Sequence, residues 1–293
     1  ANYRNFTNKL WNIARYIMTS VNDVQSIEDV EAVTLADRWI LGRLGKVTEK
    51  VTKHFENYEY SLAGETLRDF TWNEFADWYL EISKIQKDAN TDKILLHILE
   101  RVLIMWHPFM PFVTEEIYKR FDQGMLIVAS WPEVKTKLAK KDEKLFAEMQ
   151  GVISALRNVR ARYKIPNKEK LSAIIVAGTH LQDQSEIIKK LARVENLSFD
   201  DKATKPSGSS SAVIGNIQVY VPLEGIVNLE AEKQKLGKEL AQVGAYTASL
   251  TKKLANESFI RNAPEEVVEQ QRQALKEAEE KEQVLKQEID NLE

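Results

Sequence analysis

The sequence contains no cysteine, and this single absence excludes several kinds of chemistry. Without a thiol, the chain can form no disulfide, no zinc–thiolate site and no cysteine nucleophile. It also has no apolar run close to the ~20 residues that a membrane-spanning helix needs, and no signal-peptide pattern opens it. We therefore expect a cytoplasmic protein with no membrane partner.

The sequence also has no large excess of basic over acidic residues, or of acidic over basic ones. The 41 Lys+Arg and 44 Asp+Glu residues give a net charge of −3, which excludes a uniformly basic nucleic-acid binder. The distribution is nevertheless uneven, because residues 151–228 carry 11 basic and 7 acidic side chains, whereas residues 1–150 and 229–293 are net acidic. Any contact with RNA must therefore use local basic patches.

The residue patterns that usually carry catalysis are missing too. None of the four histidines stands at a metal-ligand spacing, and there is neither a phosphate-binding glycine loop nor a nucleophile elbow. The paired carboxylates Glu115-Glu116 and Glu265-Glu266 both stand at expected helix starts, where the helix dipole accounts for them. We predict no catalytic residue, no metal ligand and no cofactor in this chain.

Hydrophobic periodicity predicts a mainly α protein whose residues 1–165 form a helical bundle. The first helix carries an apolar stripe from Phe6 to Ile17, and the second opens at a capping box of Thr34 and Asp37. Further helices are expected over residues 61–84, 91–106, 114–121 and 145–165. Trp78 and Tyr79 are expected in the core, because aromatic residues at helical spacing usually pack inward.

The period changes beyond the bundle. Short β-branched runs predict strands at 173–176 and 197–199, and a hairpin of 212–214 with 217–221 turns at Gly215-Asn216. With a helix over 185–194, these elements predict a small α/β junction module at residues 166–225.

The last segment, residues 226–293, is the most regular. Apolar residues recur every seven positions from Leu229 to Leu250, and they alternate by three and four from Val268 to Leu292. Two heptad runs of similar length, interrupted at 256–263, predict an antiparallel coiled-coil hairpin in which Leu250 lies near Val268. A helix of ~27 residues would make this arm about 40 Å long.

Several motifs follow one another over some 130 residues, and their order and spacing are more specific than any of them alone. They are 8–12 (NKLWN), 36–41 (ADRWIL), 75–81 (FADWYLE), 107–118 (HPFMPFVTEEIY) and 130–132 (SWP). Together they resemble the anticodon-binding half of class I aminoacyl-tRNA synthetases for branched aliphatic amino acids. The resemblance implies an anticodon-binding domain in residues 1–165.

The C-terminal segment distinguishes among the members of that group. Its turn at 256–268 (NESFIRNAPEEVV) is similar to that of the valine enzymes, which end in a coiled-coil arm. Isoleucine enzymes commonly end in a cysteine-bound zinc module, and leucine enzymes lack a long terminal hairpin. The alternatives are the same region of another branched-chain enzyme, or a helical interaction scaffold whose arm binds protein.

The resemblance to the valine enzymes implies a C-terminal, monomeric fragment that binds tRNA(Val) through the anticodon region and the outer corner. The catalytic domain that uses ATP and Mg, and the editing domain, have no counterpart in these residues. The parent would be a valine–tRNA ligase, whereas this fragment alone is expected to be inactive.

Candidate RNA-binding residues fall in three places. The polar face of the first helix carries donors and acceptors that can bond to splayed bases, and the resemblance implies that it reads the anticodon; its members are Arg4, Asn8, Lys9, Asn12 and Arg15. A solvated helix face is the alternative on the pattern alone, and Trp11 fits a core or a base-stacking role equally well.

The other two places are basic clusters. The densest basic run lies in the only net-positive segment and is expected to contact RNA phosphates or the anticodon stem; it comprises Arg157, Arg160, Arg162 and Lys164. A second cluster gathers at the predicted tip of the arm, and the resemblance implies contact with the outer corner of tRNA; it comprises Lys252, Lys253 and Arg261. Phe259 and Ile260 lie in the same turn, where they could pack on a base or close the hairpin.

Overall fold

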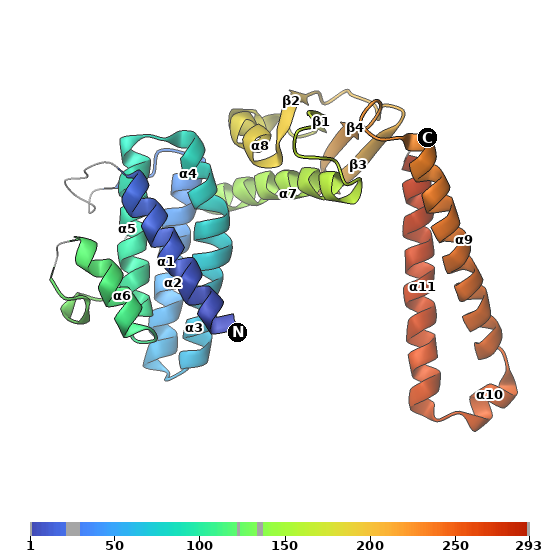
Figure 1. Cartoon of the computed structure of the whole chain (residues 1–293), viewed down its shortest axis with the longest axis horizontal. Coiled ribbons are helices and arrows are strands. Elements are labelled where there is room, and N and C mark those ends of the chain that lie inside the picture. Colours follow the sequence, from blue (N-terminus) through green and yellow to red (C-terminus); the bar gives the residue numbers. More distant parts are fainter. Residues whose placement is uncertain (1, 22–29, 122–123, 134–136, 292–293) are drawn as a thin grey trace. The chain divides into compact units, whose positions relative to one another are not determined.

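A computed structural model of the chain describes residues 2–21, 30–121, 124–133 and 137–291 (Figure 1). The chain divides into two compact units, Ala1–Gln150 and Gly151–Glu293. The prediction of a mainly helical protein with a small sheet and a helical arm is confirmed. Each unit has its own core, and each positions different candidate residues.

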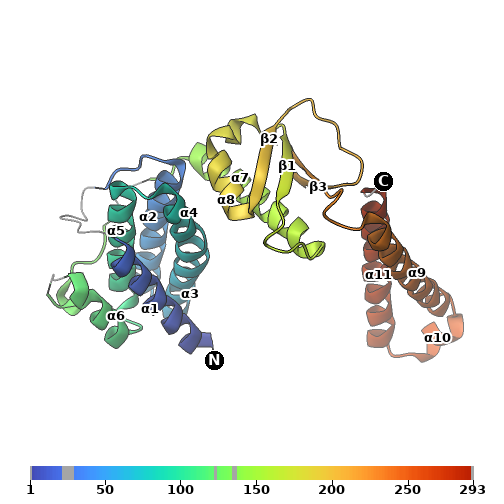
Figure 2. The ribbon, with the colours of Figure 1, turned by 45° about the horizontal axis from the view of Figure 1, so that its top comes forward.

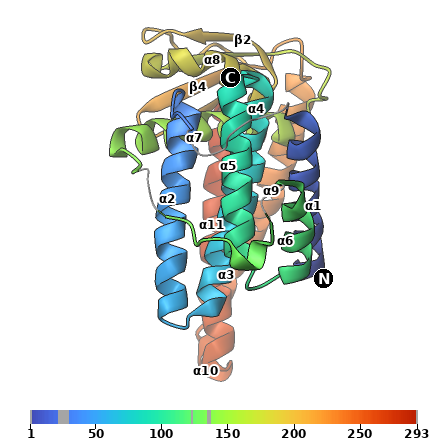
Figure 3. The same ribbon diagram turned by 90° about the vertical axis from the view of Figure 1, so that its left-hand side faces the viewer.

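The first unit is a bundle in which α1, α2 and α5 lie side by side (Figures 1 and 3). Its apolar faces meet in a core that contains Leu10, Ile40, Leu67 and Ile98, all fully buried. Its elements are α1 (Asn2–Ser20), α2 (Leu35–Glu56), α3 (Tyr60–Asp69), η1 (Phe70–Tyr79), α4 (Leu80–Gln86), α5 (Ala89–Trp106), α6 (Pro111–Tyr118), η2 (Lys119–Phe121), η3 (Leu126–Val128) and the first part of α7 (Lys140–Arg162).

The segment predicted as one helix over 61–84 is helical throughout but changes its winding. Between α3 and α4 the ten residues of η1 form a π-helix, and the Leu80 N–H donates to the Phe75 carbonyl five residues earlier. Phe70, Phe75 and Tyr79 are all fully buried, so the wider turn places three large rings in the core. Trp78 is only half-buried, although its ring packs edge-on against another aromatic side chain.

The predicted capping box ties the start of α2 to η1. Asp37 accepts the Thr34 N–H at 2.9 Å, and Thr34 accepts the Asp37 N–H at 3.1 Å. The Tyr79 hydroxyl donates to the other Asp37 oxygen at 2.8 Å. Burial raises the pKa of Tyr79, and the negative charge of Asp37 raises it further, so this hydroxyl stays protonated and keeps donating.

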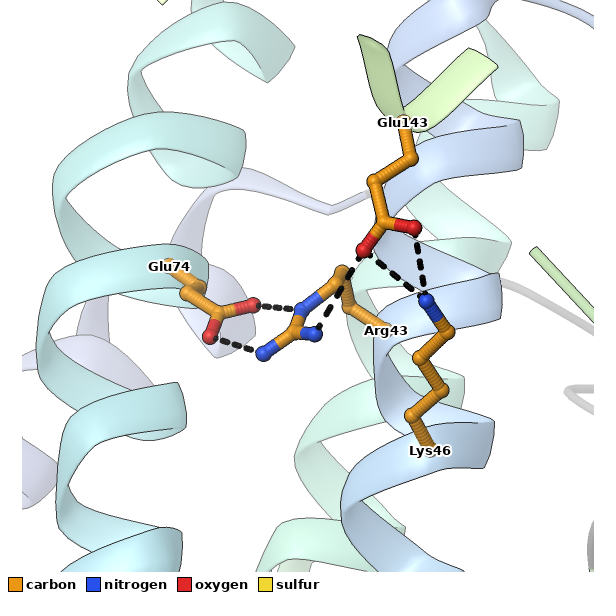
Figure 4. Close-up of polar contacts among 4 residues, drawn as sticks. All are labelled: Arg43, Lys46, Glu74 and Glu143. Carbon is orange, nitrogen blue, oxygen red and sulfur yellow. Dashed lines mark hydrogen bonds and ion pairs between the residues drawn. The ribbon is translucent and has the colours of Figure 1, made fainter. Parts of the chain in front are cut away.

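An ion-pair network joins α2 to η1 and to the start of α7 (Figure 4). Arg43 donates two parallel bonds to Glu74, at 2.6 and 2.7 Å, which is the strong fork geometry of a guanidinium with a carboxylate. Glu143 of α7 accepts from Lys46 at 2.8 Å and lies 4.0 Å from Arg43. The bond to Glu74 raises the pKa of Arg43. This network fixes η1 relative to α2, and η1 in turn borders α1.

The second unit contains a four-stranded sheet of order β2-β1-β4-β3. Figure 1 labels its four strands, and Figure 2 shows the sheet from another side. Strand β1 (Leu171–Val176) pairs parallel with β2 (Val194–Phe199) and antiparallel with β4 (Ile217–Pro222), while β3 (Ser209–Ile214) pairs antiparallel with β4. A short turn η4 (Thr179–Gln184) and α8 (Ser185–Ala192) connect β1 to β2. The expected hairpin forms, and Gly215 supplies its positive φ of 58°.

The arm is an antiparallel hairpin of α9 (Leu229–Leu254) and α11 (Glu265–Asn291), joined by the short helix α10 (Glu257–Asn262) (Figure 1). Leu236, Leu250, Val268, Ala278 and Leu285 are its buried seam residues. The ion pair Lys281–Glu239 (2.9 Å) and the bond from Lys253 to Gln271 (3.0 Å) cross from one helix to the other. The predicted antiparallel hairpin is confirmed, and Leu292, at the end of the predicted heptad run, lies outside the described residues.

We predict that Leu250→Asp opens the arm and leaves the bundle folded. Leu250 is 4% exposed, and a charge at this seam position would lose on the order of 3 kcal/mol of local stability. Hydrogen exchange followed by mass spectrometry should show faster exchange in α9 and α11 only. The control Ala248→Asp places the same charge on an exposed position of α9 and should exchange like the parent chain. Equal exchange rates in the two variants would contradict the claim that burial of Leu250 stabilises the arm.

Candidate functional site

The outer face of α1 is the first candidate surface. Phe6, Leu10, Ile13 and Ile17 are buried, so the opposite side of the amphipathic helix must face solvent. Three of the predicted contact residues lie there and are exposed, namely Asn8, Asn12 and Arg15. Arg4 belongs to α1, but its side chain lies outside the described part of the structure.

A small hollow borders this face on the α6 side. It has a volume of about 140 Å³ and is lined by Trp11, Ala14, Arg15, Met18, Thr19, Ile117 and Arg120. Trp11 is 40% exposed, so the structure places this ring at the surface and not in the core. The exposed Trp11 indole lines this hollow together with Arg15 and Arg120, a combination that suits the stacking of an unpaired base.

Lys9 lies on the other edge of the α1 face and turns towards η1. Its ammonium group lies 3.1 Å from the Asp77 carboxylate and 5.0 Å from the centre of the Trp72 ring. Sequence reasoning grouped Lys9 with the outward-facing residues, and the partners it reaches are more than 60 positions away. In this structure Lys9 holds α1 against η1.

The basic run at the end of α7 does not form one surface. Arg160 is only 8% exposed, and its guanidinium donates to three backbone carbonyls, those of Pro166, Glu169 and Arg193. Burial lowers the pKa of Arg160. Its contacts hold the chain that enters β1 and the chain that enters β2, so the structure gives this guanidinium a structural role.

The other members of that run are exposed. Arg157 donates to the Leu191 carbonyl at 2.9 Å, and the Arg162 guanidinium lies 5.3 Å from the Tyr163 ring centre. Lys164 has a φ of 50° in the turn that ends the helix. These three cations keep charge at the surface of the second unit, where an RNA phosphate can reach it.

The tip of the arm gathers cations around an aromatic ring. Lys252, Lys253 and Arg261 are exposed, and the Lys253 ammonium lies 4.8 Å from the centre of the Phe259 ring. Phe259 is half-buried, whereas Ile260 is 41% exposed. The tip therefore offers positive charge beside apolar surface, at the far end of a segment that is net acidic.

The described residues were also compared with what a metal site and a membrane-spanning helix require. Within the described ranges, no group of three or more His, Asp or Glu side chains could hold a metal ion. No helix among the described residues is long and apolar enough to cross a membrane.

Two parts of the chain match models of known protein families. Residues 37–175 match the family model of the anticodon-binding domain of tRNA ligase, and residues 228–293 match that of the valyl tRNA synthetase tRNA binding arm. The first match begins after α1, so the α1 face lies outside it.

Curated relatives extend the similarity over the whole chain. The chain is 34% identical to the valine–tRNA ligase of Syntrophotalea carbinolica over 100% of its own length and 35% of the relative. For the valine–tRNA ligase of Thermotoga maritima the identity is 33%, over 93% of this chain and 32% of the relative. For that of Lactococcus lactis it is 34%, over 94% and 34%. The chain thus spans about a third of the length of these relatives.

We predict that Arg160→Ala destabilises the second unit. Removing the guanidinium takes a donor from the carbonyls of Glu169 and Arg193 and one of two donors from that of Pro166, which also accepts the Glu169 N–H, and this should cost roughly 2–4 kcal/mol. The control Arg162→Ala, on an exposed side chain two residues later, should stay within about 0.5 kcal/mol of the parent chain. Urea unfolding measures both. If Arg160→Ala unfolds like the parent chain but binds RNA more weakly, Arg160 is a contact residue after all.

Proposed function

Because the chain belongs to the valine–tRNA ligase family, we propose that it is the tRNA-binding part of a longer enzyme that joins valine to tRNA(Val). The observation that carries the proposal is the pair of family matches, one on the helical bundle and one on the arm, each to a domain of tRNA ligases. Valine activation with ATP and Mg would belong to the two-thirds of such an enzyme that this chain does not contain. We further propose a cytoplasmic monomer.

The bundle, residues 1–165, would read the anticodon region. The exposed amides of Asn8 and Asn12 offer donors and acceptors, and Arg15 adds a cation beside the Trp11 ring. Unpaired bases present the same complementary groups on their edges, and protein side chains read RNA sequence mainly on such splayed bases. Arg4 belongs to the proposed surface on sequence grounds.

The arm, residues 226–293, would hold tRNA away from the anticodon. Its two helices form a long rod, and Lys252, Lys253 and Arg261 place three exposed cations at the tip. The acidic remainder of the arm would repel a phosphate backbone, which leaves the tip as the place of contact. Ile260 supplies apolar surface there for the outer corner of tRNA.

The module between them, residues 166–225, would join the two contacts. Arg157, Arg162 and Lys164 lead into it and are proposed to meet phosphates of the anticodon stem, since phosphate contacts position an RNA without reading its sequence. A scaffold whose arm binds protein would need none of these cations, and the same region of another branched-chain enzyme would not be expected to match the valine-enzyme arm.

We predict that Arg4→Ala and Asn8→Ala reduce discrimination between tRNA(Val) and an anticodon-swapped tRNA. Each substitution removes polar partners from unpaired bases, at a cost of roughly 1–3 kcal/mol of discrimination. Equilibrium binding of the chain to both tRNAs measures it. Asn158→Ala, on an exposed position of α7, is the matched control. Discrimination equal to that of the parent chain in both variants would mean that the surface lies elsewhere.

We also predict that the triple variant Lys252→Glu, Lys253→Glu and Arg261→Glu weakens binding without changing anticodon discrimination. Each lost phosphate contact should reduce the slope of log affinity against log salt by roughly 0.7–0.9. Affinity should fall equally for native and anticodon-swapped tRNA, because backbone contacts carry no sequence information. The control variant Lys276→Glu reverses an exposed charge on α11, away from the tip. Unchanged affinity and slope in a folded triple variant would exclude tRNA contact at the tip.

A further inference from the structure

The turn between α2 and α3 presents two tyrosines to solvent at one end of the bundle. Tyr58 is 79% exposed and Tyr60 is 50% exposed. The two rings contact each other edge-on with 6.4 Å between their centres, and the Tyr60 ring also contacts that of Phe55, 5.7 Å away. They therefore form one continuous aromatic surface, which is anchored on the half-buried Phe55.

The turn that carries these rings has a fixed conformation. Three backbone bonds close it, from the N–H groups of Asn57, Tyr58 and Glu59 to carbonyls in the last turn of α2. Tyr58 has a φ of 60°, which residues with bulky side chains rarely adopt. An exposed aromatic side chain on a rigid turn is typical of protein interfaces, because little conformational freedom is lost when a partner binds.

A hollow adjoins the aromatic surface between α2 and α3. It has a volume of about 620 Å³, and its lining includes Lys50 and His54 of α2 and Leu62 and Glu65 of α3. Leu62 is 46% exposed and follows Tyr60 by two positions, so apolar surface continues from the tyrosines to the hollow. The hollow is large enough to receive side chains of a partner.

The polar groups of the hollow are paired at one end but not at the other. Towards η1, Arg43 and Glu74 form their fork (Figure 4). Towards the turn, His54 Nδ1 bonds to Glu59 at 2.7 Å, whereas His54 Nε2 is buried and has no hydrogen-bond partner among the described residues. A buried nitrogen without a partner costs stability, so a group of a bound partner that reaches it would be favoured.

The charge around the tyrosines favours a protein over RNA as that partner. Residues 53–65 contain three glutamates and one lysine, a net charge of −2 with His54 neutral. Such a segment repels a phosphate backbone. Arginine and lysine side chains are attracted to the glutamates and also pack on the faces of tyrosine rings. The expected partner is a protein surface that carries basic as well as apolar side chains.

The relatives indicate where such a surface would come from. This chain spans 35% of the valine–tRNA ligase of Syntrophotalea carbinolica and matches its C-terminal part. Helix α1 begins at the same end of the bundle as the turn between α2 and α3 (Figures 1 and 3). The preceding part of a longer enzyme would therefore join the bundle at the end that exposes the tyrosines.

We propose that Tyr58, Tyr60 and Leu62 form the surface on which the preceding part of the longer enzyme packs. Basic side chains of that part pack on the two tyrosine rings, an apolar side chain enters the hollow beside Leu62, and a hydrogen-bonding group reaches His54 Nε2. The inference rests on the proposed function and adds to it an interface within the enzyme.

Photo-crosslinking in the longer enzyme tests this interface. With p-benzoylphenylalanine in place of Tyr58, irradiation should join position 58 to a peptide of the preceding part, which mass spectrometry identifies. The matched control carries the same residue in place of Tyr246, which is 52% exposed on α9, and should not join that part. Crosslinks from position 58 to a second copy, to tRNA or to nothing, or equal crosslinks from position 246, would overturn the proposal.

Hydrogen exchange gives a second readout and separates this interface from the proposed function. Amides of residues 56–62 should exchange at least about tenfold more slowly in the longer enzyme than in the 293-residue chain alone. The double variant Tyr58→Asp and Tyr60→Asp should abolish that difference, while the chain that carries it still binds tRNA(Val) like the parent chain. Equal exchange in the longer enzyme and the chain would contradict the interface. If the parent chain binds no tRNA, the proposed function itself fails, whatever the crosslinks show.

Discussion

The apolar stripe of α1 is the constraint on which the proposed RNA surface depends. Burial of Phe6, Leu10, Ile13 and Ile17 contributes roughly 1.5–3 kcal/mol for each side chain, and no rotation of the helix can keep this burial while hiding its polar side. The direction of Asn8, Asn12 and Arg15 is thus a consequence of core packing. The same packing brings α1 between α6 and η1, which creates the hollow beside Trp11.

In the arm, too, burial of apolar residues decides which side chains are exposed, but there the apolar residues follow a heptad repeat. Its heptad seam must be buried between α9 and α11, so the chain has to reverse at the interruption, and every residue of the turn collects at the tip. The net charge of the whole chain is only −3. It is compatible with RNA binding, because burial of the α1 stripe and of the α9–α11 seam leaves particular cations exposed. At both the α1 face and the tip of the arm, exposure of the cations follows from how the neighbouring apolar residues pack, and not from the overall composition.

Periodicity made much of this fold predictable. The capping box of Thr34 and Asp37, the hairpin at Gly215 and the buried seam that contains Leu250 and Val268 all depend on residues close in sequence or on a repeat, so a local pattern indicates them. Arg160 could not be placed in this way, because the carbonyls that it binds belong to strand entries up to 33 positions away. The π-helical winding and the hollow between α2 and α3 also depend on contacts between distant segments, so no local pattern indicates them. The exposed face of α1 was therefore predictable from periodicity, whereas the burial of Arg160 was not.

Binding of the chain to a panel of purified tRNAs at one salt concentration tests the central claim most directly. If this chain is the tRNA-recognising part of a valine–tRNA ligase, tRNA(Val) should bind at least about tenfold more tightly than tRNAs with other anticodons, a difference of about 1.4 kcal/mol. Equal affinity for every tRNA, or no binding to any of them by a folded chain, would contradict the account.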